Sequence, residues 1–128
     1  MIYQTEMVIP QNTPQQDPVI SILDCAAGVV TQVWVRWRWG AGNLAGVRIR
    51  REGVAIWPYN MDGWFNSSSL ETTWNEYYVL DAEPYSFTIE GYNEDDTFPH
   101  TVTVMLNLQR PTINDNLVQF LQYVIKGM

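Results

Sequence analysis

An alternation over positions 33–39, with apolar residues on one side and two arginines and Trp34 on the other, constrains the fold more than any other feature of this chain. Neighbouring side chains of a β-strand point to opposite faces, so these residues predict a strand with one apolar and one polar face. Residues 47–50 repeat the pattern, and residues 44–51 predict a second strand of the same kind. The polar faces of the two strands carry Trp34, Arg36, Arg38, Arg48 and Arg50. We interpret this set as a candidate interface.

The segment between the two strands, residues 40–43, reads Gly-Ala-Gly-Asn and predicts a turn, because glycine and asparagine tolerate positive φ angles. The two strands would then form a hairpin that brings the four arginines opposite one another. Like charges directly opposite are destabilising, so the arginines need carboxylates. These could come from the same subunit, from Glu71, Glu90 or Glu94, or from another subunit or partner. The sequence leaves both alternatives open.

Turn residues divide most of the chain into short segments with strand-like alternation. The expected strands span residues 2–9, 19–24, 29–39, 44–51, 54–57, 70–80, 85–92 and 100–108, with a bend near Asn75 and Glu76. Many short strands separated by turns are typical of all-β domains. We therefore predict one all-β domain over residues 1–110, an antiparallel β-sandwich or a jelly-roll-like barrel.

The remaining residues, 111–128, predict a C-terminal helical tail. Asn114 or Asp115 can cap the helix, and apolar residues then recur at helical spacing. They are Leu117, Val118, Phe120, Leu121, Val124 and Ile125. A helix this short is marginal in water unless its apolar stripe is covered. We expect the stripe to dock onto a partner or a neighbouring subunit through Leu117, Phe120, Leu121 and Val124.

The charge of the chain restricts its partners. With 14 acidic and 7 basic residues, the net charge is -7, and phosphate would be repelled over most of the surface. We expect no nucleic-acid partner. No apolar run approaches the ~18 residues of a membrane span, and the first residues lack the pattern of a secretory signal. We expect no membrane partner.

The six tryptophans allow two interpretations. One is a sugar-binding platform of exposed rings and nearby polar groups, made of Trp57, Trp64, Trp74, Asn60, Asp62 and Asn66. The other is a core or a subunit interface, and it is favoured because Trp37 and Trp39 share the predicted apolar face. Hydrophobic residues make up 46% of the chain, which is more than a monomer of this size buries easily. We expect a symmetric homo-oligomer, a trimer before a dimer.

Residues suited to catalysis or metal binding are scarce. His100 and Cys25 are the single histidine and cysteine, and neither stands in a recognised catalytic motif. We expect His100 to hydrogen-bond to the neighbouring acidic turn. That turn, Glu94-Asp95-Asp96, could hold calcium, but adjacent acids in a strand-linking loop are more often structural. We therefore predict no catalytic centre and no cofactor.

Four further segments stand out: Leu44-Ala45-Gly46-Val47, Ile56-Trp57-Pro58-Tyr59-Asn60, Gly63-Trp64, and the residues from Tyr92 to Thr101. Over roughly residues 5–108, the chain resembles β-sandwich auxiliary or decoration proteins encoded among the virion genes of tailed bacteriophages. The tryptophan-arginine run and the helical tail depart from that pattern. The resemblance implies a non-enzymatic capsid decoration or stabilising protein, located in the virion and bound to capsid or other virion subunits. The alternative is a carbohydrate-binding module of an adhesion device.

Overall fold

The computed structural model describes residues 1–60, 62–110 and 115–127, and for residues 115–119 the backbone alone. Within these residues the chain forms nine strands and one helix, which confirms the prediction of an all-β sandwich followed by a helix. The strands are β1 (Ile2–Ile9), β2 (Val19–Asp24), β3 (Gly28–Trp37), β4 (Ala45–Arg51), β5 (Val54–Trp57), β6 (Phe65–Asn66), β7 (Glu71–Leu80), β8 (Ser86–Asn93) and β9 (His100–Gln109). The helix α1 spans Asp115–Lys126.

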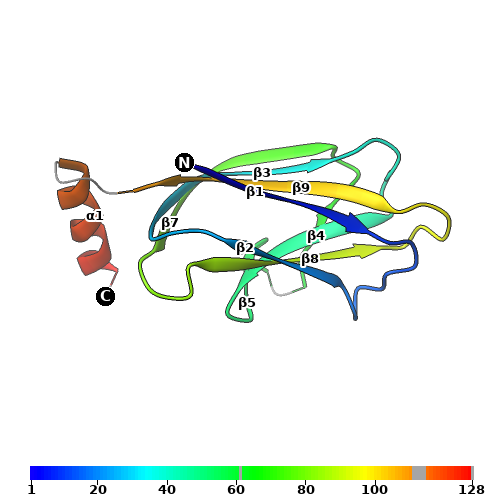
Figure 1. Cartoon of the computed structure of the whole chain (residues 1–128), viewed down its shortest axis with the longest axis horizontal. Coiled ribbons are helices and arrows are strands. Elements are labelled where there is room, and N and C mark those ends of the chain that lie inside the picture. Colours follow the sequence, from blue (N-terminus) through cyan, green and yellow to red (C-terminus); the bar gives the residue numbers. More distant parts are fainter. Residues whose placement is uncertain (61, 111–114, 128) are drawn as a thin grey trace.

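The strands form two antiparallel sheets that lie face to face (Figure 1). The first sheet has the order β1-β9-β3-β7, and the second has the order β2-β8-β4-β5, with β6 also paired to β4. The chain crosses between the sheets after most strands, so most neighbours within a sheet are distant in sequence, and the consecutive pair β4 and β5 is an exception. Two sheets connected in this order form a sandwich of the jelly-roll type.

Strands β3 and β4 do not form the predicted hairpin, because they belong to different sheets. The segment between them carries the chain across the sandwich, and Ala41 in its middle is buried. Alternation identifies the buried face of a strand but not the strand beside it, and this is why the sequence prediction was wrong. Strand β3 also ends at Trp37, so Trp39 lies in a turn with 88% of its surface exposed rather than on the apolar face.

The core lies between the facing sides of the two sheets. Val33, Val35 and Trp37 of β3 are buried there, as their alternation predicts, and Val47 and Ile49 of β4 face them from the other sheet. Strands β8 and β9 contribute further fully buried side chains, among them Phe87, Ile89, Val102, Val104 and Leu106. The core residues are therefore mostly those that the alternation places on the apolar faces.

The two edges of the sandwich differ. At one edge β1 and β2 lie side by side, and the hydroxyl oxygens of Thr5 and Ser21 are 3.2 Å apart, within hydrogen-bond distance. At the other edge, formed by β5 and β7, aromatic rings of Trp57, Trp74 and Tyr78 lie where the sheets could otherwise meet. We refer to the first as the closed edge and to the second as the open edge.

Helix α1 lies beyond one end of the sandwich rather than over a sheet (Figure 1). Tyr123 joins it to β7, since its ring centroid is 4.3 Å from that of Tyr77 and its hydroxyl donates to the Tyr77 carbonyl at 3.3 Å. Among the described residues, no helix is long and apolar enough to cross a bilayer.

The apolar stripe of α1 is only partly covered. Leu121 is half exposed, and Phe120 and Val124 are partly buried. Leu117 lies outside the described side chains. Docking of the stripe onto a partner therefore stays a prediction.

Candidate functional site: an aromatic cleft at the open edge

A cleft of about 760 Å³ opens between β5 and β7. Strand β5 and the turn after it form one wall, and the inward side chains of β7 form the other. Most of the lining is apolar, with five aromatic members: Trp57, Tyr59, Phe65, Trp74 and Tyr78. Sites that bind ligands in proteins have volumes and apolar linings of this kind, which makes the cleft the candidate site.

The rings interlock and form a firm floor. Trp57 is buried and packs edge to face against two neighbours, with centroid distances of 5.5 Å to Tyr78 and 6.3 Å to Trp74. Phe65 stacks on Trp74 with the centroids 4.8 Å apart. Each such pair is worth about 0.5–1.5 kcal/mol beyond simple burial, so the floor is held in place without a ligand. Tyr59 stands at the rim with 88% of its surface exposed.

Three charged residues line the cleft: Arg51, Glu52 and Glu76. Arg51 is tied to the loop after β7, since its guanidinium donates to the Ala82 carbonyl at 2.6 Å and to the Tyr78 hydroxyl at 3.3 Å. Glu76 accepts a hydrogen bond of 2.9 Å from the Trp74 indole N–H. The cleft therefore has an apolar floor with two carboxylates and one anchored guanidinium around it.

The backbone of β7 beside the cleft has unused hydrogen-bonding groups. The Trp37 N–H donates to the Leu70 carbonyl at 2.7 Å, and the register continues from this pair without a break to Asn75. Alternate residues of an antiparallel strand bond to the same neighbour, so the backbone groups of Glu71, Thr73 and Asn75 point away from β3. Strand β7 is the last of its sheet, and within the described residues these groups form no backbone hydrogen bond. The cleft thus borders a strand that can still pair.

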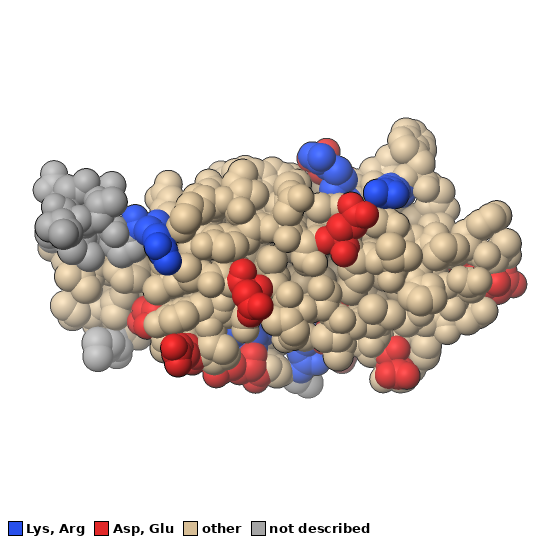
Figure 2. Space-filling view, viewed as in Figure 1, with Lys and Arg blue, Asp and Glu red and all other residues tan. Residues whose placement is uncertain are grey.

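The structure separates the candidate interface residues of the sequence into two groups. Trp34, Arg36 and Arg38 lie on the outer face of the first sheet, where Arg36 pairs with Glu71 and Arg38 with Glu6, both at 3.1 Å. The side chains of these pairs are at least half exposed, and exposed pairs contribute about 0–1 kcal/mol. On the face shown in Figure 2, the basic side chains are few and form no continuous patch.

Arg48 and Arg50 lie on the outer face of the second sheet. Both donate to one oxygen of Glu90, at 3.0 and 3.3 Å, and this carboxylate is nearly buried. The Arg48 guanidinium also lies over the Trp64 ring, 4.2 Å from its centroid. All four arginines therefore pair with acids of the same chain. The sequence had left open whether the acids would come from the same subunit or from another one. Glu71 and Glu90 were among the acids expected from the same subunit.

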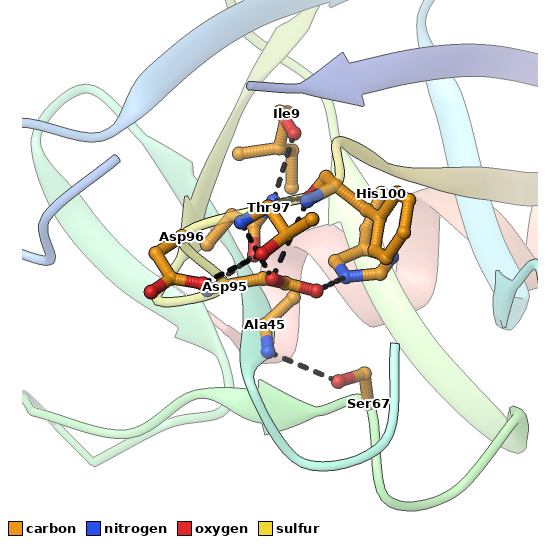
Figure 3. Close-up of polar contacts among 9 residues, drawn as sticks. Ile9, Ala45, Ser67, Asp95, Asp96, Thr97 and His100 are labelled. Carbon is orange, nitrogen blue, oxygen red and sulfur yellow. Dashed lines mark hydrogen bonds and ion pairs between the residues drawn. The ribbon is translucent and has the colours of Figure 1, made fainter. Parts of the chain in front are cut away.

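His100 is bound to the acidic turn, as predicted (Figure 3). Its Nε2 lies 2.8 Å from Asp95 Oδ2, and the ring is buried. Backbone N–H donation from Thr97, reinforced by the bond to His100, lowers the pKa of the Asp95 carboxyl from its ordinary value. Burial, together with the nearby Asp24, raises the pKa of the Cys25 thiol to about 11, so this thiol is protonated and weakly nucleophilic at neutral pH.

The other carboxylates of that turn are occupied by the chain itself. Glu94 accepts a bond from Gln15 at 3.3 Å, and Asp96 accepts one from the Thr97 hydroxyl at 2.8 Å (Figure 3). The described residues contain no cluster of His, Cys, Asp and Glu side chains arranged to hold a metal ion. The geometry therefore corresponds to a structural turn.

The tryptophans proposed as a sugar platform do not form one. Trp57 is buried and its ring plane is inclined by 68° to that of Trp74, while Trp64 packs edge to face on Tyr92 at 4.8 Å. Two of the three nevertheless belong to the cleft. The sequence prediction missed Phe65, Glu76 and Tyr78, although the alternation of Trp74, Glu76 and Tyr78 in one strand already placed them on one face.

No protein-family model matches the chain, and no curated protein matches it. Among solved structures it is similar to PliG of Aeromonas hydrophila, a periplasmic lysozyme inhibitor of g-type lysozyme. The two share 13% sequence identity and a TM-score of 0.47, over 83% of this chain and 86% of that one. A likeness at this level assigns neither activity nor location to this chain.

The expectation of a capsid decoration protein is wrong. The protein found in the comparison is a periplasmic inhibitor and not a virion component, so the decoration role, the capsid partners and the virion location are dropped. The expectation rested on short segments such as residues 56–60 and 92–101, which lie in turns and strand ends of the sandwich. Such segments recur for conformational reasons and do not specify a partner.

Proposed function

We propose that this protein is a non-enzymatic binding domain that holds an extended segment of a partner protein at the open edge. The segment would add a strand beside β7 and place alternate side chains in the aromatic cleft. The observation that carries the proposal is the combination of the two features at one place: outward backbone groups of Glu71, Thr73 and Asn75, and a cleft lined by the inward side chains of the same strand.

An extended segment fits this site better than a compact small molecule. Strand addition supplies main-chain hydrogen bonds for affinity, while pockets for alternate side chains supply specificity. Strand β7 already has the required period of two, because Thr72 and Trp74 point inward and the residue between them points outward. A compact ligand would fill the cleft but leave the backbone groups of β7 unused.

The charges at the site favour a neutral or basic segment over an acidic one. Two carboxylates and one guanidinium line the cleft, and the chain as a whole carries a net charge of -7. Complementary charge speeds encounter and excludes partners of like charge.

The chemistry of the described side chains supports binding rather than catalysis. The Cys25 thiol is held protonated, and the His100 ring is buried against Asp95. Neither residue lines the cleft.

A pair of variants at Thr73 tests the proposal. Thr73 is exposed, and its N–H points outward. Thr73→Pro removes this donor, whereas Thr73→Val keeps it and preserves the strand propensity. A display library of random linear peptides is panned on the chain, and the Kd of synthetic versions of the enriched peptides is measured by tryptophan fluorescence. We expect Thr73→Pro to weaken binding about tenfold and Thr73→Val to leave it unchanged.

Failure to enrich any peptide, or equal Kd values for the two variants, contradicts the proposal. Circular dichroism of both variants provides the control for folding. If Thr73→Pro loses the sandwich, cyclised and linear forms of one peptide are compared instead, since strand addition requires the extended form.

A second copy of this chain is the competing occupant of the open edge. Two β7 strands could pair edge to edge, which would produce a two-fold dimer and not the trimer that the sequence analysis put first. Light scattering distinguishes the cases. A monomer of 14.8 kDa supports a foreign segment, whereas a stable oligomer that Thr73→Pro dissociates would assign the edge to self-association and overturn the proposal.

A further inference from the structure

Glu76 and Glu52 are the two carboxylates that line the cleft, and Glu76 is the less exposed of the two. Within the described residues, Glu6, Glu71 and Glu90 each pair with an arginine, whereas neither Glu76 nor Glu52 forms an ion pair. Glu76 is partly exposed in the cleft. An unpaired carboxylate beside apolar rings is costly to desolvate unless a cation accompanies it.

The Trp74 indole fixes the orientation of Glu76. Its N–H donates to Oε1 at 2.9 Å, and no described residue donates to the second oxygen. A carboxylate can only accept hydrogen bonds, so the free oxygen calls for a donor. The electron-rich faces of Trp74 and Tyr78, which share the lining, also attract a cation.

Alternation along β7 places Glu76 on the same face as Trp74 and Tyr78, and the register with β3 shifts beside it. The register with β3 passes from Gln32–Asn75 to Val30–Tyr78, so Glu76 and Tyr77 stand where β3 has Thr31 alone. Bulges of this kind commonly occur beside functional positions. The bend predicted near Asn75 and Glu76 coincides with it.

The guanidinium of the cleft does not neutralise Glu76. Arg51 donates to the carbonyls of Ala82 and Pro84 and to the Tyr78 hydroxyl, and it forms no ion pair within the described residues. Its hydrogen bonds hold it against the loop after β7. The negative charge of Glu76 is therefore available to a ligand.

We propose that Glu76 selects a lysine or arginine side chain in the bound segment. This inference rests on the proposed function. In a strand added to β7, the inward side chain over Trp74 is apolar, and the inward side chain beside Glu76 is basic and donates to its free oxygen. Outward positions, which face solvent beside Thr73 and Asn75, carry no such requirement.

Parallel selections test this specificity. The library of linear peptides is panned on the wild-type chain, on Glu76→Gln and on Glu83→Gln. The amide of Glu76→Gln still accepts from the Trp74 N–H but removes the charge, and Glu83→Gln removes one charge at an exposed position outside the cleft. We expect a basic residue two positions from an apolar one in peptides selected on the wild type and on Glu83→Gln, and no such enrichment on Glu76→Gln.

Affinity gives the quantitative result. One enriched peptide is made with its basic residue intact and with norleucine in its place. We expect the basic form to bind the wild type about tenfold more tightly and to lose this advantage on Glu76→Gln. Peptides that bind without a basic preference, or that keep it on Glu76→Gln, overturn this inference while peptide binding itself stands. If no peptide binds, the proposed function fails and this inference with it.

Discussion

The closed and open edges are both formed by edge strands of the two sheets, but the strands meet at the closed edge and are separated by a cleft at the open edge. At the closed edge the inward residues Thr5 and Ser21 are small, and Gly91 of β8 leaves room for Met7 and Ile9, whose ends lie within 2.7 Å of where a Cβ would stand. Thr5 and Ser21 can then meet at 3.2 Å. At the open edge the corresponding positions hold aromatic rings, which pack on one another and keep the sheets apart.

The two edges differ in the size of the side chains where the edge strands face each other, which are Thr5 and Ser21 at the closed edge and Trp57 and Trp74 at the open edge. Small inward residues let two edge strands approach, so that core burial is completed within the chain. Large rings at the other edge bury most of their own surface but leave a lined opening. The closed edge therefore serves stability, and the open edge combines stability with a surface that another segment can cover.

Deleting a core side chain at the closed edge should have the largest effect on stability. Ile9 is fully buried, and Ile9→Ala leaves a cavity where β1 packs on the second sheet. We expect the free energy of unfolding to fall by about 2–5 kcal/mol in urea titrations. Peptide affinity of the fraction that remains folded should not change, because Ile9 is remote from the cleft lining. A loss below ~1 kcal/mol would mean that the edge is not closed as described.

Deleting a ring at the open edge should have a smaller effect on stability and a larger one on binding. Trp74 is only partly buried, so Trp74→Ala should cost roughly half of the 3–5 kcal/mol typical of a buried aromatic residue. It also removes the floor of the cleft and the donor to Glu76. We expect binding of selected peptides to be lost in fluorescence titrations. Trp74→Phe, which keeps a ring, should retain part of it.

The acidic turn next to the closed edge should make stability depend on pH. Asn93 beside this turn donates to the Ile9 carbonyl at 3.1 Å, and hydrogen bonds lower the pKa of Asp95 in the folded state. A lowered pKa means that the stabilisation is complete above the ordinary value of about 3.9 and is lost as the pH falls through the folded value.

We therefore expect Asp95→Asn to be less stable than the wild type at pH 7, with a difference that shrinks as the pH falls below about 4. Urea titrations of both chains across this range check the expectation. The paired design cancels the titration of the other carboxylates. A difference that stays constant with pH would show that the charge of Asp95 does not contribute.

The contact between α1 and the open edge should have the smallest effect. Tyr123→Phe removes the hydroxyl that donates to the Tyr77 carbonyl at 3.3 Å but keeps the ring contact. The site is exposed, so we expect the free energy of unfolding to change by less than about 0.5 kcal/mol. Hydrogen exchange at Tyr77 and its neighbours should rise slightly. A large loss of stability would show that α1 is part of the folding unit of the sandwich.

The sequence predicted the elements better than their arrangement. Residues 54–57, for example, form a strand with the predicted ends, and the buried face of β3 is the predicted one up to Trp37. Trp39 was misplaced because alternation continues beyond the point where the chain turns away. The sequence analysis named Trp57 and Trp74 as candidate functional residues, but it expected them to form a planar platform. Their edge-to-face contact could not be predicted, because nothing in the local sequence shows how two distant rings will meet.

By itself, the sequence determined which residues form strands and which side of each strand is apolar, because both follow from rules that act between neighbours along the chain. Only the tertiary structure decided that Val33 lies beside Leu106, that β3 and β4 belong to different sheets, and that β5 and β7 face each other across a cleft. Those pairings join segments far apart in sequence. They are selected by the packing of all side chains at once, which no single stretch of the chain encodes.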